Sequence, residues 1–276
     1  MRRTFAQKLM LYGTVVLTCA MLIFPVYWMA ITALAPVNKL RAFPPAFFPA
    51  DPQWQTFVHV LFERPVPLWL TNSLLAALGA TALSMSVSIL AAYSLSRFRV
   101  RGGHSLGLFI LISKMLPATL LVIPLFAIFR EMKLIGSLWS IIIAHATLIV
   151  PFSTWMLKGY FDSIPRELEQ AAEVDGCTPL GALWRVVLPI SAPGLAATAL
   201  YGIVLSWSDF AFARTFLTAE QKNWTANVGI ATFKGEYITD WNVVMAGALM
   251  AAVPIMVIYL FLERYLVGGL TAGAEK

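Results

Sequence analysis

Long apolar runs separated by short polar connections dominate the chain. The first run, residues 9–35, contains no charged residue and exceeds the ~20 apolar residues that a helix needs to cross a bilayer. Further apolar runs occupy residues 68–95, 105–129, 134–157, 194–213 and 243–262. Such runs form helices in lipid, because a helix satisfies its backbone hydrogen bonds internally. The pattern therefore predicts an all-α, polytopic membrane protein with six transmembrane helices.

Composition supports this class. Of 276 residues, 59% are hydrophobic and only 12% are charged, whereas a soluble domain usually carries about 25% charged residues. The net charge is +6, but the basic residues lie beside the apolar runs and form no long patch, so we expect no nucleic-acid partner. Cys19 and Cys177 are the only cysteines, which leaves neither a disulfide framework nor a metal cluster. We therefore expect no metal and no cofactor in this chain.

The distribution of basic residues predicts the orientation in the bilayer. Six spans place both termini on the same side, and the connections on that side hold more Lys and Arg than the opposite ones. Because such an excess marks the cytoplasmic side, both termini and the connection at residues 158–190 are expected in the cytoplasm. The longest connection on the other side, residues 36–67, includes a predicted interfacial helix at 53–62, with Trp54 and Val58 on its apolar face.

Two of the predicted spans have unusual content. Residues 68–95 are rich in Ala, Ser and Gly, which lets helices approach closely in lipid, so this span is expected in the interior of the helix bundle. Residues 105–129 contain Lys114, Pro117 and Pro124, so that span should be neither uniform nor straight.

The polar stretch at residues 163–189 predicts two short helices between membrane spans. Ser163 can cap the first helix and Gly176 ends it. Thr178 opens the second, which runs through residue 187 and ends at Pro189. Ala171 and Ala172 are small residues at which a partner could approach closely.

The same stretch contains EQAAEVDG at residues 169–176, and it resembles the EAA-type loop of membrane subunits of ATP-binding-cassette importers. The wider chain is similar to the maltose-type, carbohydrate-transporting permeases of this class from about residue 68 onward. The resemblance rests on TNSLLAALGATALS, AAYSLSRFRVRGG, MLPATLLVIPLF, LPISAPGLAATAL, SWSDFAF and LVGGLTAG, which occur in the order expected of that family.

This resemblance implies a domain organisation and a set of partners. Residues 1–67 would form an N-terminal transmembrane helix and an extracytoplasmic loop, 68–265 the permease core, 158–190 the cytoplasmic coupling loop within it, and 266–276 a C-terminal tail. The chain would sit in the bacterial cytoplasmic (inner) membrane with a homologous second permease, two ATPase subunits and an extracytoplasmic solute-binding protein. ATP and Mg would be bound by the ATPase subunits, since this chain has no G-x-x-x-x-G-K-[ST] phosphate loop. It would not be an enzyme itself.

The resemblance also assigns residues to coupling with the ATPase. Where this chain has Gln170 the family usually has Glu, so a charge contact with the partner is missing and would be made instead by Glu169 or Glu173. The residues expected in the ATPase-coupling loop are Glu169, Gln170, Ala171, Ala172, Asp175 and Gly176.

Ionisable residues inside a membrane are costly and commonly face a cavity, which makes them candidates for the solute passage. Asp209, with Ser208 and Trp207, occupies the position of a polar pair in the family motif. If the fifth helix continues, Arg214 lies close to Asp209, so an internal ion pair between them is an alternative to a solute contact. For Lys114 two positions are open, facing the passage or reaching the membrane surface, and together with Arg214 it leaves open an anionic sugar derivative as the solute.

Two other functional classes fit the pattern less well. An ion-coupled secondary transporter would show internal repeats and mid-membrane carboxylates, and Asp209 is the one candidate in the spans. An intramembrane enzyme would need paired catalytic residues in the spans; His145 stands alone and is expected to make a hydrogen bond between helices. The solute itself is not specified by the sequence.

Overall fold

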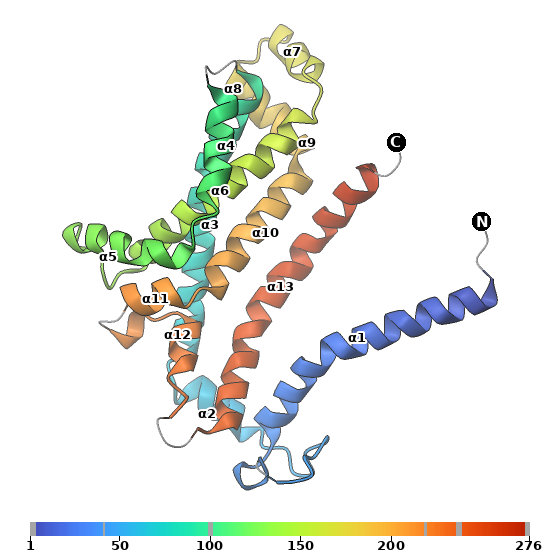
Figure 1. Cartoon of the computed structure of the whole chain (residues 1–276), viewed down its shortest axis with the longest axis vertical. Coiled ribbons are helices and arrows are strands. Elements are labelled where there is room, and N and C mark those ends of the chain that lie inside the picture. Colours follow the sequence, from blue (N-terminus) through green and yellow to red (C-terminus); the bar gives the residue numbers. More distant parts are fainter. Residues whose placement is uncertain (1–3, 41, 99–101, 218–219, 236–238, 274–276) are drawn as a thin grey trace. The chain divides into compact units, whose positions relative to one another are not determined.

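The computed structural model describes residues 4–40, 42–98, 102–217, 220–235 and 239–273 (Figure 1). The described residues form helices, turns and loops and include no strand, so the all-α prediction is confirmed for them. The chain divides into two compact units. One contains residues 1–67 and 229–253, and the other contains residues 68–228 and 254–276.

Four of the described helices are long and apolar enough to cross a membrane: α1 (Phe5–Leu34), α3 (Val66–Arg97), α6 (Leu138–Asp162) and α13 (Trp241–Gly273), the last over its first 23 residues. A fifth candidate is the pair formed by Pro179–Ile190 and α10 (Ala192–Ser208), which is bent by 82°. The predicted third span is instead broken into α4 (Gly103–Ser113), η2 (Ala118–Leu121) and α5 (Val122–Glu131). Six spans therefore remain a prediction, and the expected irregularity of residues 105–129 is confirmed.

In the first unit, α1 begins with a capping box, in which Thr4 accepts a hydrogen bond from the backbone of Gln7 and the Gln7 side chain accepts one from Thr4. Side chains from residue 4 to residue 26 are exposed, as expected of a helix that meets lipid or another chain. The predicted interfacial helix is α2 (Gln55–Phe62), and the side chains on its expected apolar face, Trp54 and Val58, are 66% and 53% exposed.

In the second unit, α10 packs along α6, and α3 approaches both of them (Figure 1). The approach is close at Gly202 of α10, where an added Cβ would lie 3.0 Å from Thr81 Oγ1 and 3.3 Å from Ile149. One face of α3 is buried, and it carries the small residues that were expected to allow close packing, at helical spacing: Ser73, Ala76, Ala77, Ala80, Ser84 and Ser88.

The stretch after α6 forms α7 (Glu167–Val174), α8 (Pro179–Ala182), the π-helix η3 (Leu183–Val187) and α9 (Leu188–Ile190). Ser163 does not cap α7; it ends α6, and its hydroxyl donates to the Tyr160 carbonyl. The second predicted helix begins as expected, with the Thr178 hydroxyl accepting from the N–H of Gly181 (3.1 Å). It does not end at Pro189, because proline is tolerated in the first turn of α9.

A turn at Gly176 and a buried apolar cluster hold these short helices in position. Gly176 has φ +91°, a left-handed conformation that suits glycine, at the turn between α7 and α8. Behind the turn, a buried apolar cluster joins α3, α6 and the short helices. Its fully buried members are Ala92, Leu157, Phe161, Leu183 and Val187.

The C-terminal tail predicted at residues 266–276 is continuous with α13 as far as Gly273. Its side chains and its last three residues lie outside the described part of the structure.

Candidate functional site

A cavity of about 880 Å³ lies in the second unit, where the predicted third span is broken. Its walls come from the segment between α4 and α5, from the middle of α6, and from the end of α10. Most of the lining is apolar, and the polar and charged side chains that line it are Ser113, Lys114, Thr147, Ser208 and Asp209. Three of these five residues were predicted for the passage; Ser113 and Thr147 were missed, although a hydroxyl within an apolar span was the available signal.

Lys114 is placed in this cavity by the break after α4. Pro117 supplies no backbone N–H for a continuing helix and restricts the residue before it, so the chain unwinds between residues 114 and 117. The Lys114 ammonium group donates to the Leu148 carbonyl of α6, and it lies 5.6 Å from the centre of the Tyr201 ring of α10. An ammonium carries three N–H donors, so further donors are available to a polar group in the cavity.

Asp209 ends α10 and begins the next helix. Its backbone is extended (φ −68°, ψ 140°), so the helix does not continue past Ser208. The carboxylate accepts hydrogen bonds from the N–H groups of Phe212 (3.3 Å) and Ala213 (2.9 Å) at the start of α11 (Ala211–Phe216). This satisfies backbone donors that the helix itself leaves unpaired, as an N-capping residue does.

The carbonyl groups freed by the same break are also satisfied. The amide of Asn227 donates to the carbonyl oxygens of Trp207 (2.8 Å) and Asp209 (3.2 Å). A break in a membrane helix is tolerated where neighbouring groups pair the freed backbone in this way. The irregular backbone at Asp209 is therefore a stable part of the cavity wall.

His145 is the side-chain partner of Asp209. Its ring is buried, with Nε2 3.3 Å from Asp209 Oδ2 and Nδ1 2.7 Å from the Ser206 hydroxyl. The expected hydrogen bond between helices is thus present. The alternative ion pair of Asp209 with Arg214 is wrong: α10 ends before Asp209, so helical spacing no longer brings the two together, and the exposed Arg214 guanidinium lies 5.8 Å from the centre of the Trp224 ring.

The predicted passage residues therefore separate into two groups. Lys114, Ser208 and Asp209 line one cavity. Trp207 is 7% exposed and packs with Ala77 and Ile203 in an apolar cluster. Arg214 is exposed, and the described lining of the cavity does not include it.

In the predicted coupling loop, the Glu169 carboxylate is paired within the chain. This side chain is buried, its Oε1 lies 2.5 Å from Arg97 Nε, and its Oε2 accepts from the Tyr93 hydroxyl (2.9 Å). The expectation that Glu169 replaces the missing charge toward a partner is therefore wrong, because its carboxylate is occupied within the chain. Sequence reasoning missed both Tyr93 and Arg97, which lie more than 70 residues away in sequence.

The other predicted loop residues remain on the surface. Gln170, Ala171, Asp175 and Gly176 are exposed, and Ala172 is half-buried. Large apolar side chains are also exposed in this stretch: Val174 (88%), Leu180 (57%) and Trp184 (64%).

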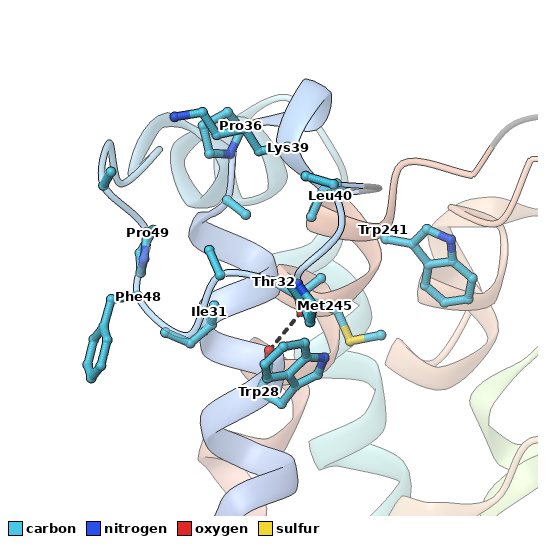
Figure 2. Close-up of a pocket in the computed structure, with 15 residues that line it drawn as sticks. Trp28, Ile31, Thr32, Pro36, Lys39, Leu40, Phe48, Pro49, Trp241 and Met245 are labelled. Carbon is cyan, nitrogen blue, oxygen red and sulfur yellow. Dashed lines mark hydrogen bonds between the residues drawn. The ribbon is translucent and has the colours of Figure 1, made fainter.

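A smaller cavity, of about 340 Å³, lies in the first unit between the end of α1, the loop that follows it and the start of α13 (Figure 2). Figure 2 shows Trp28 and Met245 beside Thr32, whose hydroxyl donates to the Trp28 carbonyl (2.8 Å). Among the described residues that line this cavity, Lys39 is the one charged side chain. It contains none of the predicted site residues.

Comparison with known proteins identifies relatives along the whole chain. The sulfoquinovosyl glycerol transport system permease protein of Agrobacterium fabrum is 35% identical over 92% of this chain and 89% of its own length. The diacetylchitobiose uptake system permease protein of Streptomyces coelicolor is 30% identical over the full length of both. The trehalose/maltose transport system permease protein of Thermococcus litoralis is 30% identical over 100% of this chain and 99% of its own.

The fold is shared with a solved membrane protein. A chain of a bacterial ABC transporter involved in the import of the acidic polysaccharide alginate matches with a TM-score of 0.81 and 21% identity, over 96% of this chain and 99% of that one.

Residues 84–267 match the family described as binding-protein-dependent transport system inner membrane component. This match spans α6, α10, the cavity and the stretch that contains Glu169. Because the matched residues make up more than half of the chain, the chain belongs to the family of inner membrane components of binding-protein-dependent transport systems.

Proposed function

We propose that this chain is the permease subunit of an ATP-driven, binding-protein-dependent importer for a sugar, an oligosaccharide or a sugar derivative, and that it forms half of the translocation pathway. The observation that carries the proposal is the cavity at the broken span, lined by Lys114, Ser208 and Asp209, in a chain of this family. The three relatives named above support the solute class, because each is named for the transport of a saccharide or glycoside. Family membership also removes the alternative of an ion-coupled secondary transporter.

The partners follow from this function. We propose a homologous second permease, two ATP-binding-cassette ATPase subunits and an extracytoplasmic solute-binding protein, in a bacterial cytoplasmic membrane. ATP and Mg are bound, and ATP is hydrolysed, on the ATPase subunits. The family of the chain and its long apolar helices support this division of labour.

The exposed part of the 158–190 loop is the proposed contact with the ATPase. Its small side chains at Ala171 and Ala172 permit close packing, and Asp175 with Gly176 shapes the turn that follows. The exposed apolar side chains Val174, Leu180 and Trp184 on the same stretch support a partner surface there, since exposed apolar patches mark interaction sites.

Within the cavity, Lys114 and Ser208 are the proposed contacts with the solute. Hydroxyl and ammonium groups pair with the hydroxyl groups of a sugar, and the ammonium also favours an anionic group on it. Asp209 contributes by holding the wall of the cavity, since its carboxylate is already paired with His145 and with two N–H groups. Arg214 is not part of this proposal.

The test uses the complete complex in proteoliposomes, with a neutral glycoside and an anionic analogue of similar size as paired solutes. For Lys114→Met, we expect uptake of the anionic solute to fall by about ten-fold more than that of the neutral one, the size of one lost charged hydrogen bond. Lys114→Arg keeps the charge and serves as the control. Equal losses for both solutes would refute the anionic preference, and import by this chain without ATPase subunits would refute the permease assignment.

A further inference from the structure

A buried ion pair joins the end of α3 to α7. Arg97 is the last residue of α3, and its Nε lies 2.5 Å from Glu169 Oε1, with each side chain only 8% exposed. Burying two charges costs free energy that their attraction only partly returns, so a buried pair is weak evidence of a stabilising role. The pair is more informative about which helices it connects.

The second oxygen of the same carboxylate is also held by α3. The Tyr93 hydroxyl, one turn before Arg97, lies 2.9 Å from Glu169 Oε2 and 3.1 Å from the carbonyl oxygen of Pro179 in α8. Both oxygens of Glu169 therefore contact one helix end. The same tyrosine hydroxyl reaches the two short helices on either side of the Gly176 turn.

Arg97 also reaches the link between α6 and α7. Its guanidinium donates to the Ile164 carbonyl (3.1 Å) and to the Ser96 hydroxyl (3.1 Å), which in turn donates to Asp162 at the end of α6 (2.6 Å). From the other side, Arg166 donates to the Ser96 carbonyl (2.8 Å). The end of α3 thus contacts the end of α6, the link and α7.

We infer that Arg97 and Tyr93 are positioning residues that act through Glu169, so that α7 moves together with the end of α3. This inference rests on the function proposed above, in which the exposed face of α7 meets the ATPase. Residues 163–166 are a short link without a helix of their own, and the Gly176 turn follows α7. Without the ion pair, a displacement imposed on α7 would be absorbed by these two links instead of reaching the membrane helices.

The experiment compares Arg97→Glu, Glu169→Arg and the double variant in the complete complex in proteoliposomes. The readout is solute imported per ATP hydrolysed in the presence of solute-loaded binding protein. We expect each single variant to lower this ratio by about ten-fold, and the double variant, which restores opposite charges, to recover at least about a third of it. Tyr93→Phe should lower the ratio by about two-fold, since it removes one hydrogen bond and keeps the ring.

Lys222→Gln is the matched control. Lys222 pairs with Glu220 at 2.7 Å outside the coupling loop, and both side chains are on the surface, 69% and 54% exposed, so the ratio should stay unchanged. Glu169→Gln covers the case in which a charge reversal prevents assembly. It keeps the shape and an oxygen acceptor, and it should assemble with a ratio reduced by about three-fold, as a lost charge contact implies.

Hydrogen exchange of residues 167–174 in the complex gives a readout that does not depend on transport. Exchange should be faster in both single variants and return toward the wild-type rate in the double variant. Single variants with the wild-type ratio and wild-type exchange would overturn the inference, as would an assembled double variant no better than the singles. A wild-type complex that imports nothing, with the exchange pattern as expected, would count against the proposed function and leave the positioning role standing.

Discussion

Asp209 provides the sharpest test of how the wall of the cavity is built. Its carboxylate caps α11 through the N–H groups of Phe212 and Ala213, and it pairs with the buried His145. Substitution by Asn keeps an oxygen acceptor of the same length and removes the charge. Substitution by Ala removes both. Comparing the two variants therefore separates capping from charge.

The magnitudes follow from these contacts. Asn and Asp are about equally good N-capping residues, whereas replacement by Ala costs ~0.5–2 kcal/mol. Loss of a negative charge near a helix N-terminus costs ~0.3–1 kcal/mol. We therefore expect Asp209→Asn to cost about 0.3–1 kcal/mol and Asp209→Ala about 1–3 kcal/mol. On the scale of domains of 150–250 residues, each kcal/mol lowers the melting temperature by about 2–4 °C.

Thermal melting of the purified complex in detergent, followed by the loss of its size-exclusion peak, gives the ranking. Asp51→Ala is the control, because this exposed carboxylate accepts from the Gln53 side chain at the surface and its loss should cost less than about 0.5 kcal/mol. If the Asn variant melts as low as the Ala variant, capping contributes nothing. If both melt with the wild type, the role assigned to Asp209 in the cavity wall is wrong.

Two further variants test the packing of the bundle and the contact with the ATPase. An added Cβ at Gly194 would overlap the Tyr160 ring, so Gly194→Ala should lower the melting temperature of the complex through an overpacking cost of about 1–3 kcal/mol. Gly159→Ala is the control: its added Cβ meets open space, so the melting temperature should not fall. Ala171→Arg places a long charged side chain on the exposed face of α7 and should abolish solute-stimulated ATP hydrolysis in the reconstituted complex while the permease still folds. Normal stimulation in that variant would exclude Ala171 from the contact.

The helices of this protein were predictable to different degrees. The apolar runs at residues 9–35 and 243–262 led directly to α1 and α13, because hydrophobicity over ~20 residues is a property of the sequence itself. The small-residue face of α3 was also visible in advance, since its spacing follows the helical period. Residues 105–129 are also mostly apolar, yet they form three short elements, and the prolines indicated irregularity without specifying where the chain would unwind.

The candidate site was predicted in part. Lys114, Ser208 and Asp209 could be named because polar groups stand out in an apolar span, and they line one cavity. The same reasoning also named Trp207 and Arg214, one of which lies in an apolar cluster and the other on the surface. Helical spacing was applied across Asp209, and it failed there because the backbone leaves the helix at that residue.

The sequence by itself determined that the chain is helical and built for a membrane, because hydropathy and helical period are local properties. It also determined the family, through motifs that keep their order along the chain. Only the tertiary structure decided the partners of each charged side chain. Glu169 pairs with Arg97 and Tyr93 across more than 70 residues, and Asp209 pairs with His145 on another helix. Such partners depend on how helices pack and where they break, and neither is encoded in the residues adjacent to the charge.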